Sequence, residues 1–301
     1  MSNGRIGVVG LGVLGSAIAE VLLKNGFDVV GFDIDAGQAA DLNARGLSRA
    51  ASLGDLAVES QTVLTCLPNE QALHGVFAAD AGLVGPDLAG KVIIETSTLP
   101  IPAKEQARAQ AAAADAEMLD CPLSGNRIMA LKGELTAFAS GNEDTYGRAE
   151  AVLQGFCREA HYVGPFGDGM KMKICGNILN LVHNSAAAEV MVLGMKSGLD
   201  PKMIHKVISG SGSSSRMFDV RGGLMAENDY GKDGMNFSIP LKDARIISQQ
   251  AADVLCPIPV YQAALQPYYA AVAQGHFDED ASAVCSALEL AANCVREKDK
   301  S

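Results

Sequence analysis

The sequence is poor in several features that mark particular classes of protein. Only 24 Lys and Arg stand against 35 Asp and Glu, and the formal charge of −11 argues against binding to nucleic acid or to an anionic membrane. The seven cysteines form no CxxC pair, which favours reduced thiols over a disulfide framework. The histidines show no HxH or HExxH spacing and no GxSxG elbow occurs, so we expect neither a metal site nor a hydrolase.

Long apolar runs are also scarce near the start of the chain. The apolar stretch from Val8 to Leu23 is too short to span a bilayer and is interrupted by Gly10, Gly12, Gly15 and Glu20. The first strand-like run begins at Arg5, so we expect no signal or transit segment and a cytoplasmic protein. The 301 residues, 48% of them hydrophobic, suffice for one large or two ordinary domains.

The first half of the chain alternates short β-branched runs with helical stretches. The strand-like runs are RIGVVG, FDVVGFDID, TVLTCLP, KVIIETST, AEMLDCPLSG, LTAFASG and AHYVG. This alternation predicts βαβ units and a mainly parallel sheet with helices on both faces. After Gly169 the strand signal ends, and segments such as KICGNILNLVHNSAAAEVMVLGMKSG have helical periodicity. We therefore predict an α/β domain over residues 1–165 and an all-α domain over residues 166–301.

Three glycines follow the first strand-like run in VVGLGVLGSAIAEVLLKNG. In a GxGxxG spacing the first glycine permits a tight turn, the second lets the backbone approach a pyrophosphate, and the third lets helix and strand pack closely. A phosphate bound there accepts hydrogen bonds from the free N–H groups of the helix N-terminus. The pattern predicts an NAD-binding Rossmann domain, with candidate cofactor-binding residues Gly10, Leu11, Gly12, Val13, Leu14 and Gly15.

Further cofactor-binding candidates lie at the ends of later strands. Asp33 ends the second strand-like run, eighteen residues after Gly15, where a carboxylate can accept hydrogen bonds from the adenosine ribose. The same charge repels a 2′-phosphate, so we expect NAD rather than NADP. Ligands of such sheets sit beyond the carboxyl ends of the strands, which makes Leu67, Pro68 and Thr98 candidates for the cofactor wall. Alternatively, these three are ordinary strand-to-loop residues.

The segment GPFGDGMKMKICGN contains two lysines at the start of a predicted helix. Lys173 and Asn177 are four residues apart and share a helix face, whereas Lys171 lies about 200° around the axis from Lys173. Asn180 and Asn184 extend the polar stripe along an otherwise apolar helix. Because buried polar groups need partners, the stripe either lines a pocket or satisfies a neighbouring helix.

Four motifs in a fixed order make essentially the whole chain resemble the β-hydroxyacid dehydrogenase family, which includes 3-hydroxyisobutyrate dehydrogenase and tartronate semialdehyde reductase. The motifs are GLGVLG, DCPLSGNRIMALKGEL (120–135), GPFGDGMKMKICGN and FSIPLKDARI (237–246). The resemblance implies an NAD(P)-dependent oxidoreductase that transfers a hydride between a nicotinamide and a small 3-hydroxy acid. It also implies an active site between the two domains, and it agrees with the homodimer or tetramer that the apolar runs YYAAVA and ALELAANCV predict.

The resemblance further implies roles for individual residues. Lys173 is expected to be the catalytic acid/base, and Asn177 to hold this lysine and the substrate hydroxyl. Ser124 and Gly125 are expected to grip the substrate carboxylate. Lys242 is expected to border the nicotinamide end of the cofactor site.

The chain departs from the family pattern at two places, which puts the usual small substrates in doubt. Asn126 stands where a second glycine is usual, so it either adopts a left-handed turn or places its side chain in the pocket. Gly176 replaces an asparagine. A lysine acts as a base only if burial or a neighbouring cation lowers its pKa, and Lys242 or Arg127 can supply that cation.

Two questions stay open at this point. The Gly/Ser-rich segment 209–223 is either a flexible connection or a substrate lid, with Arg216 and Arg221 within it as candidates to meet an acidic substrate. The fold also occurs in imine reductases, which tend to replace the lysine at position 173, and a dinucleotide-binding protein without turnover is a second alternative.

Overall fold

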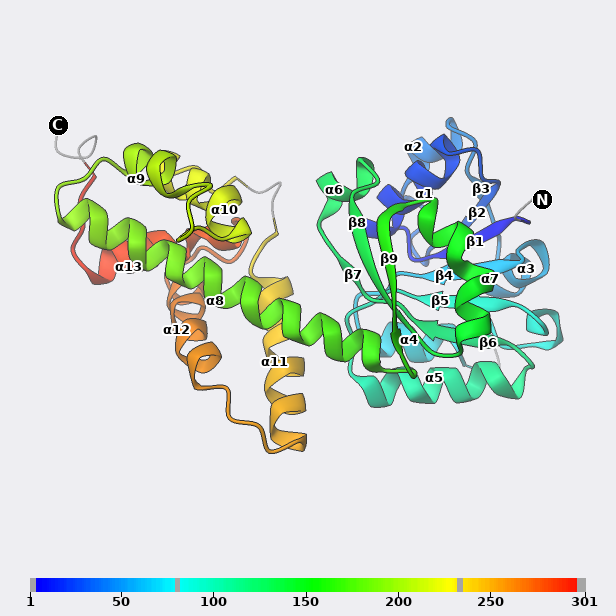
Figure 1. Cartoon of the computed structure of the whole chain (residues 1–301). Coiled ribbons are helices and arrows are strands. Elements are labelled where there is room, and N and C mark those ends of the chain that lie inside the picture. Colours follow the sequence, from blue (N-terminus) through cyan, green and yellow to red (C-terminus); the bar gives the residue numbers. More distant parts are fainter. Residues whose placement is uncertain (1–3, 79–81, 232–234, 297–301) are drawn as a thin grey trace. The chain divides into compact units, whose positions relative to one another are not determined.

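The computed structural model describes residues 4–78, 82–231 and 235–296 (Figure 1). The chain forms two compact units, Met1–Lys173 and Ile174–Ser301. The division falls within one helix, α8 (Asp168–Lys196), which contributes its first residues to the first unit and the rest to the second. The boundary predicted between residues 165 and 166 stays a prediction.

A sheet of nine strands among the described residues forms the centre of the first unit. Six strands run parallel in the order β3-β2-β1-β4-β5-β6, and β8 follows, paired with both β7 and β9. The strands are β1 (Ile6–Val9), β2 (Val29–Phe32), β3 (Ser48–Arg49), β4 (Thr62–Thr65), β5 (Val92–Glu95), β6 (Glu117–Asp120), β7 (Leu123–Ser124), β8 (Leu135–Ser140) and β9 (Cys157–Gly164).

Helices cover both faces of this sheet because successive strand residues point to opposite sides. Leu64 and Ile94 pack in one apolar core with α1 and α7, whereas Val63 and Ile93 pack in the other with α3, α4 and α5 (Figure 1). The helical elements are α1 (Val13–Lys24), α2 (Ala40–Asn43), α3 (Leu53–Glu59), α4 (Glu70–Val76), η1 (Pro86–Leu88), α5 (Ile101–Ala113), α6 (Arg127–Leu131) and α7 (Glu143–Gln154). The predicted doubly covered α/β domain is confirmed.

Polar side chains fix where several of these helices begin. The side chains of Ser52, Asn69 and Asn142 accept hydrogen bonds from the backbone N–H groups of the first turns of α3, α4 and α7. Each cap satisfies a donor that lacks a partner within its helix. The helices therefore start directly after strands β3, β4 and β8, which keeps the strand ends in a common layer.

The sheet differs from the predicted pattern at one edge, where β8 runs antiparallel to β6 and β7. A parallel return needs a crossover of about a dozen or more residues. Between β7 and β8 the chain has only the five-residue helix α6 and short turns. The connection from β7 to β8 is therefore too short for a parallel return, so β8 runs in the opposite direction. The next strand, β9, pairs parallel with β8.

The second unit is helical, as predicted, and the one β-pairing among its described residues is an isolated bridge between Asn236 and Asp280. Its elements after α8 are α9 (Pro201–Ile208), α10 (Arg216–Glu227), α11 (Ser238–Asp253), α12 (Pro259–Ala273), η2 (Ala281–Ala283) and α13 (Val284–Ala291). By length and mean hydropathy alone α8 could cross a membrane, a property shared with core helices of globular proteins. Its Ser185 hydroxyl donates to the carbonyl oxygen of Ala264 at 2.6 Å, so this face of α8 packs on α12.

Candidate active site

The glycine turn between β1 and α1 is packed through its backbone. Gly10 has a φ of +89°, and a Cβ on it would lie 2.3 Å from the carbonyl oxygen of Cys66. A Cβ on Gly15 would lie 1.9 Å from the carbonyl oxygen of Gly10. By contrast, no heavy atom of the described residues lies within 4 Å of a Cβ built on Gly12. The turn thus leaves a space at Gly12 that fits a phosphate at the helix N-terminus.

The other residues of the turn differ in exposure. Leu11 is fully buried, Leu14 is half-buried, and Val13, the first residue of α1, is 72% exposed. Burial raises the pKa of Cys66, which follows β4, to about 11. This thiol is therefore neutral at neutral pH and does not oppose a bound phosphate.

Asp33, directly after β2, is held against the glycine turn. Its Oδ2 accepts a hydrogen bond from the N–H of Leu11 at 2.7 Å, and its Oδ1 accepts one from the N–H of Asp35 at 2.9 Å. The residue is half-buried, so its remaining lone pairs face solvent beside the turn. Arg49, at the end of the neighbouring strand β3, reaches the loop after β2, where it donates to the carbonyl oxygen of Gln38 at 2.6 Å.

The predicted cofactor wall lies at the ends of β4 and β5. Leu67 is half-buried, Pro68 is exposed and Thr98 is half-buried. The N–H of Leu67 donates to the Ser97 hydroxyl at 2.8 Å, which ties the two strand ends together. Because β4 is the neighbour of β1 in the sheet, these residues follow the strand beside the glycine turn. Their contact with a cofactor stays a prediction.

The segment after β7 carries the predicted carboxylate grip. Ser124 ends β7 and is half-buried, and Gly125 has a φ of +136° that L-residues rarely adopt. Asn126 does not adopt a left-handed turn: its φ of −124° is extended, and its side chain accepts a hydrogen bond from the N–H of Met129 at 3.0 Å. It is the N-cap of α6, so one glycine with a positive φ suffices for this loop.

Arg127 connects this loop to the glycine turn between β1 and α1. Its Nη1 donates to the carbonyl oxygen of Val13 at 2.8 Å and to the hydroxyl of Ser16 at 3.0 Å. The guanidinium therefore lies on the first turn of α1, beside the space at Gly12. Its positive charge adds to that of the helix N-terminus, which favours a bound anion.

Helix α8 carries both lysines of the GPFGDGMKMKICGN motif. Lys173 is half-buried, and Asn177 follows it by four residues on the same helix face. Lys171 is exposed and pairs with Asp168 at 2.8 Å, as the sequence predicts for the solvent side. The two lysines therefore lie on different sides of α8.

Asn177 is oriented by an acid that the sequence analysis did not single out. Its Nδ2 donates to Oδ2 of Asp243 on α11 at 2.9 Å, and Oδ1 of the same carboxylate lies 3.0 Å from Nζ of Lys242. Asp243 is 8% exposed. The signal was present, because Asp243 directly follows Lys242 in the FSIPLKDARI motif. Within the second unit, Asn177, Lys242 and Asp243 thus form one polar cluster.

The rest of the polar stripe serves the helical core. Asn180 donates to Oδ1 of Asn177 at 3.4 Å, so it belongs to the same cluster. Asn184 is fully buried and donates to the Tyr268 hydroxyl at 2.7 Å and to the carbonyl oxygen of Ala281 at 3.0 Å. For Asn184 the second alternative therefore applies, because it satisfies neighbouring segments, whereas a pocket lined by the other residues of the stripe stays a prediction.

The Gly/Ser-rich segment 209–223 is only partly a loop. The Ser215 side chain caps α10, which starts at Arg216. Arg221 is buried and pairs with Asp280 at 3.5 Å, so it stabilises the helical unit and is not a candidate to meet substrate. Arg216 is exposed. The connection that stays a lid candidate is residues 209–214.

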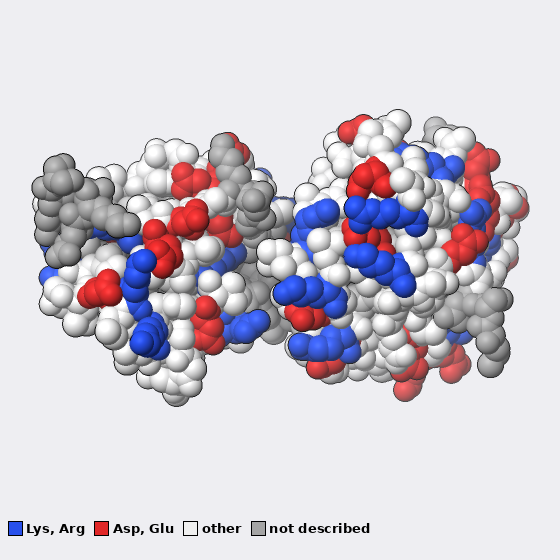
Figure 2. Space-filling view, turned by 90° about the horizontal axis from the view of Figure 1, so that it is seen from above, with Lys and Arg blue, Asp and Glu red and all other residues white. Residues whose placement is uncertain are grey.

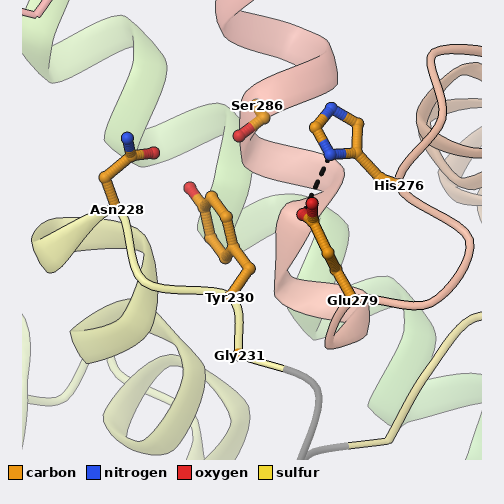
Figure 3. A pocket seen from close by; sticks show the side chains of 6 residues that line it. All are labelled: Asn228, Tyr230, Gly231, His276, Glu279 and Ser286. Carbon is orange, nitrogen blue, oxygen red and sulfur yellow. Dashed lines mark hydrogen bonds and ion pairs between the residues drawn. The ribbon is translucent and has the colours of Figure 1, made fainter.

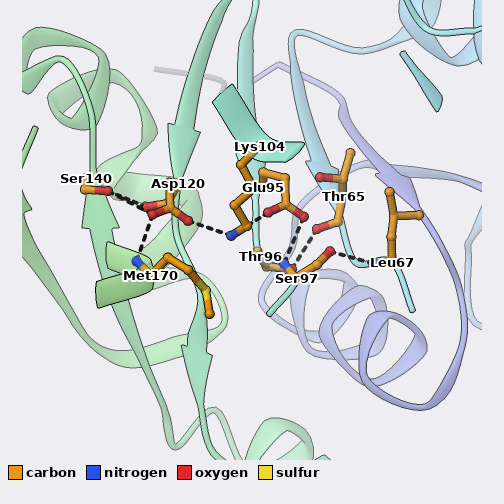
Figure 4. A network of polar contacts seen from close by, with 9 residues as sticks. All are labelled: Thr65, Leu67, Glu95, Thr96, Ser97, Lys104, Asp120, Ser140 and Met170. Carbon is orange, nitrogen blue, oxygen red and sulfur yellow. Dashed lines mark hydrogen bonds and ion pairs between the residues drawn. The ribbon is translucent and has the colours of Figure 1, made fainter. Parts of the chain in front are cut away.

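A second set of polar residues that the sequence analysis did not single out lies in the sheet (Figure 4). Lys104 on α5 contacts the carboxylates of Glu95 and Asp120 at 2.7 Å and 2.6 Å, and all three side chains are fully buried. Acids at the ends of buried strands are a signal that sequence reasoning can use. The lysine gave no signal, because an alanine-rich helix with a lysine is typical of a surface helix.

A pocket of about 430 Å³ lies in the second unit (Figure 3). It is lined by Asn228, Tyr230, Gly231, His276, Glu279 and Ser286. Nδ1 of His276 lies 2.9 Å from Oε2 of Glu279, so these two groups satisfy each other. None of the predicted catalytic or cofactor-binding residues lines this pocket.

Charged side chains of both signs lie next to one another on the surface (Figure 2). An example is Glu20, whose carboxylate contacts Lys24 and Arg45 at 2.7 Å each. In the described part of the chain, no group of three or more His, Cys, Asp and Glu side chains is arranged to hold a metal ion. All seven cysteines are free thiols.

Two family models match the chain. Residues 5–164 match the NAD binding domain of 6-phosphogluconate dehydrogenase, and residues 167–288 match the model described as NAD-binding of NADP-dependent 3-hydroxyisobutyrate dehydrogenase. The first model covers the glycine turn and the whole sheet, and the second covers α8 to the start of α13. Both units therefore belong to NAD(P)-dependent dehydrogenases.

Curated relatives extend over nearly the full length. L-threonate dehydrogenase of Cupriavidus necator is 34% identical over 93% of this chain and 94% of its own. The mitochondrial 3-hydroxyisobutyrate dehydrogenase of Mus musculus is 29% identical over 94% of this chain and 86% of its own. NAD-dependent L-serine dehydrogenase of Pseudomonas aeruginosa is 29% identical over 93% and 96%.

Solved structures show the same fold. The 3-hydroxyisobutyrate dehydrogenase from Salmonella typhimurium superposes with a TM-score of 0.83 at 28% identity, covering 94% of this chain and 99% of that one. Psf3, solved in complex with NADP+ and 2-OPP, superposes with a TM-score of 0.84 at 25% identity and the same coverage. From the two matching models and the near full-length relatives, we conclude that this chain belongs to the β-hydroxyacid dehydrogenase family and is an NAD(P)-dependent hydroxyacid oxidoreductase.

Proposed function

We propose that the protein is an NAD-dependent dehydrogenase of a small 3-hydroxy acid, with Lys173 as the general acid/base. The observation that carries the proposal is the placement of Lys173 and Asn177 on one face of α8, with the Asn177 amide held by the buried carboxylate of Asp243. Because Asp243 holds its side-chain nitrogen, the side-chain oxygen of Asn177 points in a defined direction. It can therefore orient a lysine and a hydroxyl one helical turn away.

In the proposed mechanism the chain supplies proton transfer and orientation. The nicotinamide, when bound, accepts the hydride from the hydroxyl-bearing carbon. The neutral Lys173 amine takes the hydroxyl proton as the hydride leaves, and in the reducing direction its ammonium returns that proton. Lys242, whose ammonium also contacts the Asp243 carboxylate at 3.0 Å, is proposed to attract the substrate carboxylate.

The loop at Ser124 and Gly125 is the proposed carboxylate grip. A hydroxyl and unobstructed backbone N–H groups suit a carboxylate, and the positive φ of Gly125 allows the backbone to turn towards it. The names of the relatives point to substrates of one chemical kind, because threonate, serine and 3-hydroxyisobutyrate each carry a carboxylate and a hydroxyl. We therefore propose a hydroxy acid of three to five carbons.

A substrate panel tests this proposal. The enzyme is mixed with NAD or NADP and hydroxy acids of three to five carbons, and formation of the reduced nicotinamide is followed by its absorbance. Oxidation of at least one acid with NAD supports the proposal. Turnover of imines alone would instead favour the imine reductases, which share the fold at 18% identity and a TM-score of 0.62. Cofactor binding without any turnover would indicate a sensor protein.

The glycine turn gives a prediction with a built-in control. Gly12→Ala places a methyl group in the space at Gly12, so we expect NAD affinity to fall at least about tenfold while the melting temperature of the free protein stays nearly unchanged. Gly15→Ala forces its Cβ against the Gly10 carbonyl, so both stability and NAD affinity should fall. Thermal unfolding and NADH fluorescence titration measure the two effects. Equal NAD affinity in the Gly12 variant and the wild type would place the phosphate elsewhere.

Asp33 carries the proposed preference for NAD. Replacement by serine removes the charge that repels a 2′-phosphate and leaves the cation of Arg49, which contacts the same loop from β3. We expect the ratio of kcat/KM for NAD over NADP to fall at least about tenfold, a change of about 1.4 kcal/mol. Steady-state kinetics with both cofactors measure this ratio. An unchanged ratio would assign cofactor choice to other residues.

We also propose that the helical unit forms a homodimer or tetramer. Several large apolar side chains of this unit are more than half exposed, among them Leu193, Val207, Leu255, Val260 and Leu290. Burying such residues against a second copy stabilises an assembly. Sedimentation velocity measures the state, and a monomer at micromolar concentration would contradict it.

A further inference from the structure

A row of polar residues ends four adjacent strands of the sheet. Thr65, Glu95 and Asp120 are the last residues of β4, β5 and β6 and lie in register with one another, and Ser140 of β8 pairs with Asp120. All four are fully buried. Such a row is costly in an apolar core unless its members bond to one another. The ends of β4, β5 and β6 also form the edge of the sheet at which the proposed cofactor wall lies.

Lys104 joins the two acids of this row (Figure 4). It lies on the buried face of α5, among Ala103, Ala107 and Ala111, and its Nζ bridges Asp120 Oδ1 and Glu95 Oε2. Burial by itself lowers the pKa of Lys104, but the two carboxylates more than offset this, so the pKa of the lysine is raised. The ammonium is therefore charged at neutral pH.

From Asp120 the contacts lead to α8. Oδ2 of Asp120 accepts a hydrogen bond from the N–H of Met170 at 2.8 Å, which is one of the donors that lack a partner in the first turn of a helix. The helix start is also pressed onto the sheet, because a Cβ on Gly169 would lie 2.3 Å from the carbonyl oxygen of Phe138. Lys173 follows Met170 by three residues, slightly less than one turn.

From Glu95 the contacts lead to the cofactor wall. Oε1 of Glu95 accepts a hydrogen bond from the N–H of Ser97 at 2.9 Å, and the Ser97 hydroxyl accepts one from the N–H of Leu67 at 2.8 Å. The loops after β4 and β5 are thus fixed relative to the same ammonium that fixes the start of α8. All of these contacts lie within the first unit.

The charges explain why a lysine is suited to this position. One ammonium between two carboxylates leaves a net charge of −1 if both acids are ionised, and the N-terminus of the 29-residue helix α8 supplies about half a positive charge at Asp120. Without the ammonium, two buried carboxylates would face one another and one would take up a proton. An uncharged Asp120 would bind the N–H of Met170 less strongly.

We propose that Lys104 is a positioning residue for the reaction: through Asp120 and Glu95 it fixes the first turn of α8, and with it Lys173, relative to the loops that form the cofactor wall. The inference rests on the proposed role of Lys173 as acid/base. A loss of alignment by about 1 Å can cost a factor of about 10² in rate, so the network has a kinetic effect beyond stability.

The test uses two variants that alter the network between α8 and the cofactor wall at different bonds. The double variant Glu95→Gln/Lys104→Met removes one charge of each sign and keeps acceptors for the N–H groups of Ser97 and Met170, but it removes the bridge between them. Asp120→Asn keeps the pair of Lys104 with Glu95, but its single amide oxygen cannot accept from both Lys104 and Met170, so one of these two bonds is lost. For each variant, the melting temperature, the Kd for NADH and kcat are measured well below the unfolding transition.

We expect kcat of both variants to fall at least about tenfold. The Kd for NADH should change less than about threefold, because the glycine turn is outside the network. A purely structural role predicts a lower melting temperature with kcat within about twofold of wild type for the folded enzyme, which would overturn the inference. If the double variant does not fold, the kcat of Asp120→Asn alone tests the inference. Lys173→Met is assayed in parallel: its full activity would refute the proposed function itself, whereas an inactive Lys173 variant with active network variants would refute only this inference.

Discussion

Replacement of Lys173 with methionine should lower kcat by about 10²- to 10⁴-fold, the usual contribution of a general acid/base. Methionine has nearly the same length as lysine without the amine, so it removes the proposed proton acceptor and retains the apolar stem of the side chain. Binding of NADH should stay within about threefold of wild type, because the glycine turn and Asp33 are unchanged. Direct fluorescence of the reduced nicotinamide, excited at wavelengths at which the protein does not absorb, measures this binding.

Lys171→Met is the matched control for this variant. Lys171 lies two residues earlier on the same helix, is exposed, and pairs with Asp168 at 2.8 Å. A surface pair of this kind contributes at most about 1 kcal/mol to stability, so we expect its kcat to remain near that of wild type. An unimpaired rate in the Lys173 variant would refute the assignment. Equal losses in both variants would mean that charge on α8, rather than one amine, supports turnover.

Replacement of Lys104 with methionine should lower the free energy of unfolding by about 3–5 kcal/mol, the range for a buried ion pair that loses one partner. Two fully buried carboxylates would remain, with no cation between them. Urea unfolding at neutral pH measures the loss. The exposed Lys132 provides a control, because Lys132→Met should change stability by less than about 0.5 kcal/mol.

The loss at Lys104 should also depend on pH. In the variant, the folded state gains by protonating one of the two facing acids, so it binds a proton more readily than the unfolded chain does. Stability then falls as pH rises, and the difference from wild type should be smaller at about pH 5 than at about pH 8. A difference that does not change with pH would mean that lost packing, rather than uncompensated charge, causes the destabilisation.

Local signals in the sequence predict much of this fold. Gly10, Gly12 and Gly15 follow one strand and start one helix, so a few adjacent residues determine the turn, and Asp33 has a spacing set by one βαβ unit. The helical half follows from periodicity. The periodicity does not give the antiparallel direction of β8, because that direction follows from the short connection between β7 and β8 and not from the residues of β8 itself.

Polar residues with distant partners are harder to interpret from sequence. Lys104 contacts acids at the ends of two other strands, and Arg221 pairs with Asp280, far along the chain. A lysine or arginine in a helix is usually exposed, so these positions resemble surface residues until the tertiary contacts are known. Asn126 shows that a local signal was also overlooked. Asparagine is a common N-cap of helices, and here its side chain accepts a hydrogen bond from the N–H of Met129, three residues later.

Helix α8 continues without a break past Lys173, the last residue of the first unit, to Asn177 in the second. Four residues of an α-helix rise about 6 Å, and backbone hydrogen bonds keep that rise fixed. The amine and the amide are thus spaced by the pitch of a single rod rather than by the docking of two surfaces. If the proposed roles hold, substitutions in the loops around the substrate can change which acid is accepted without altering the spacing of Lys173 and Asn177 along α8.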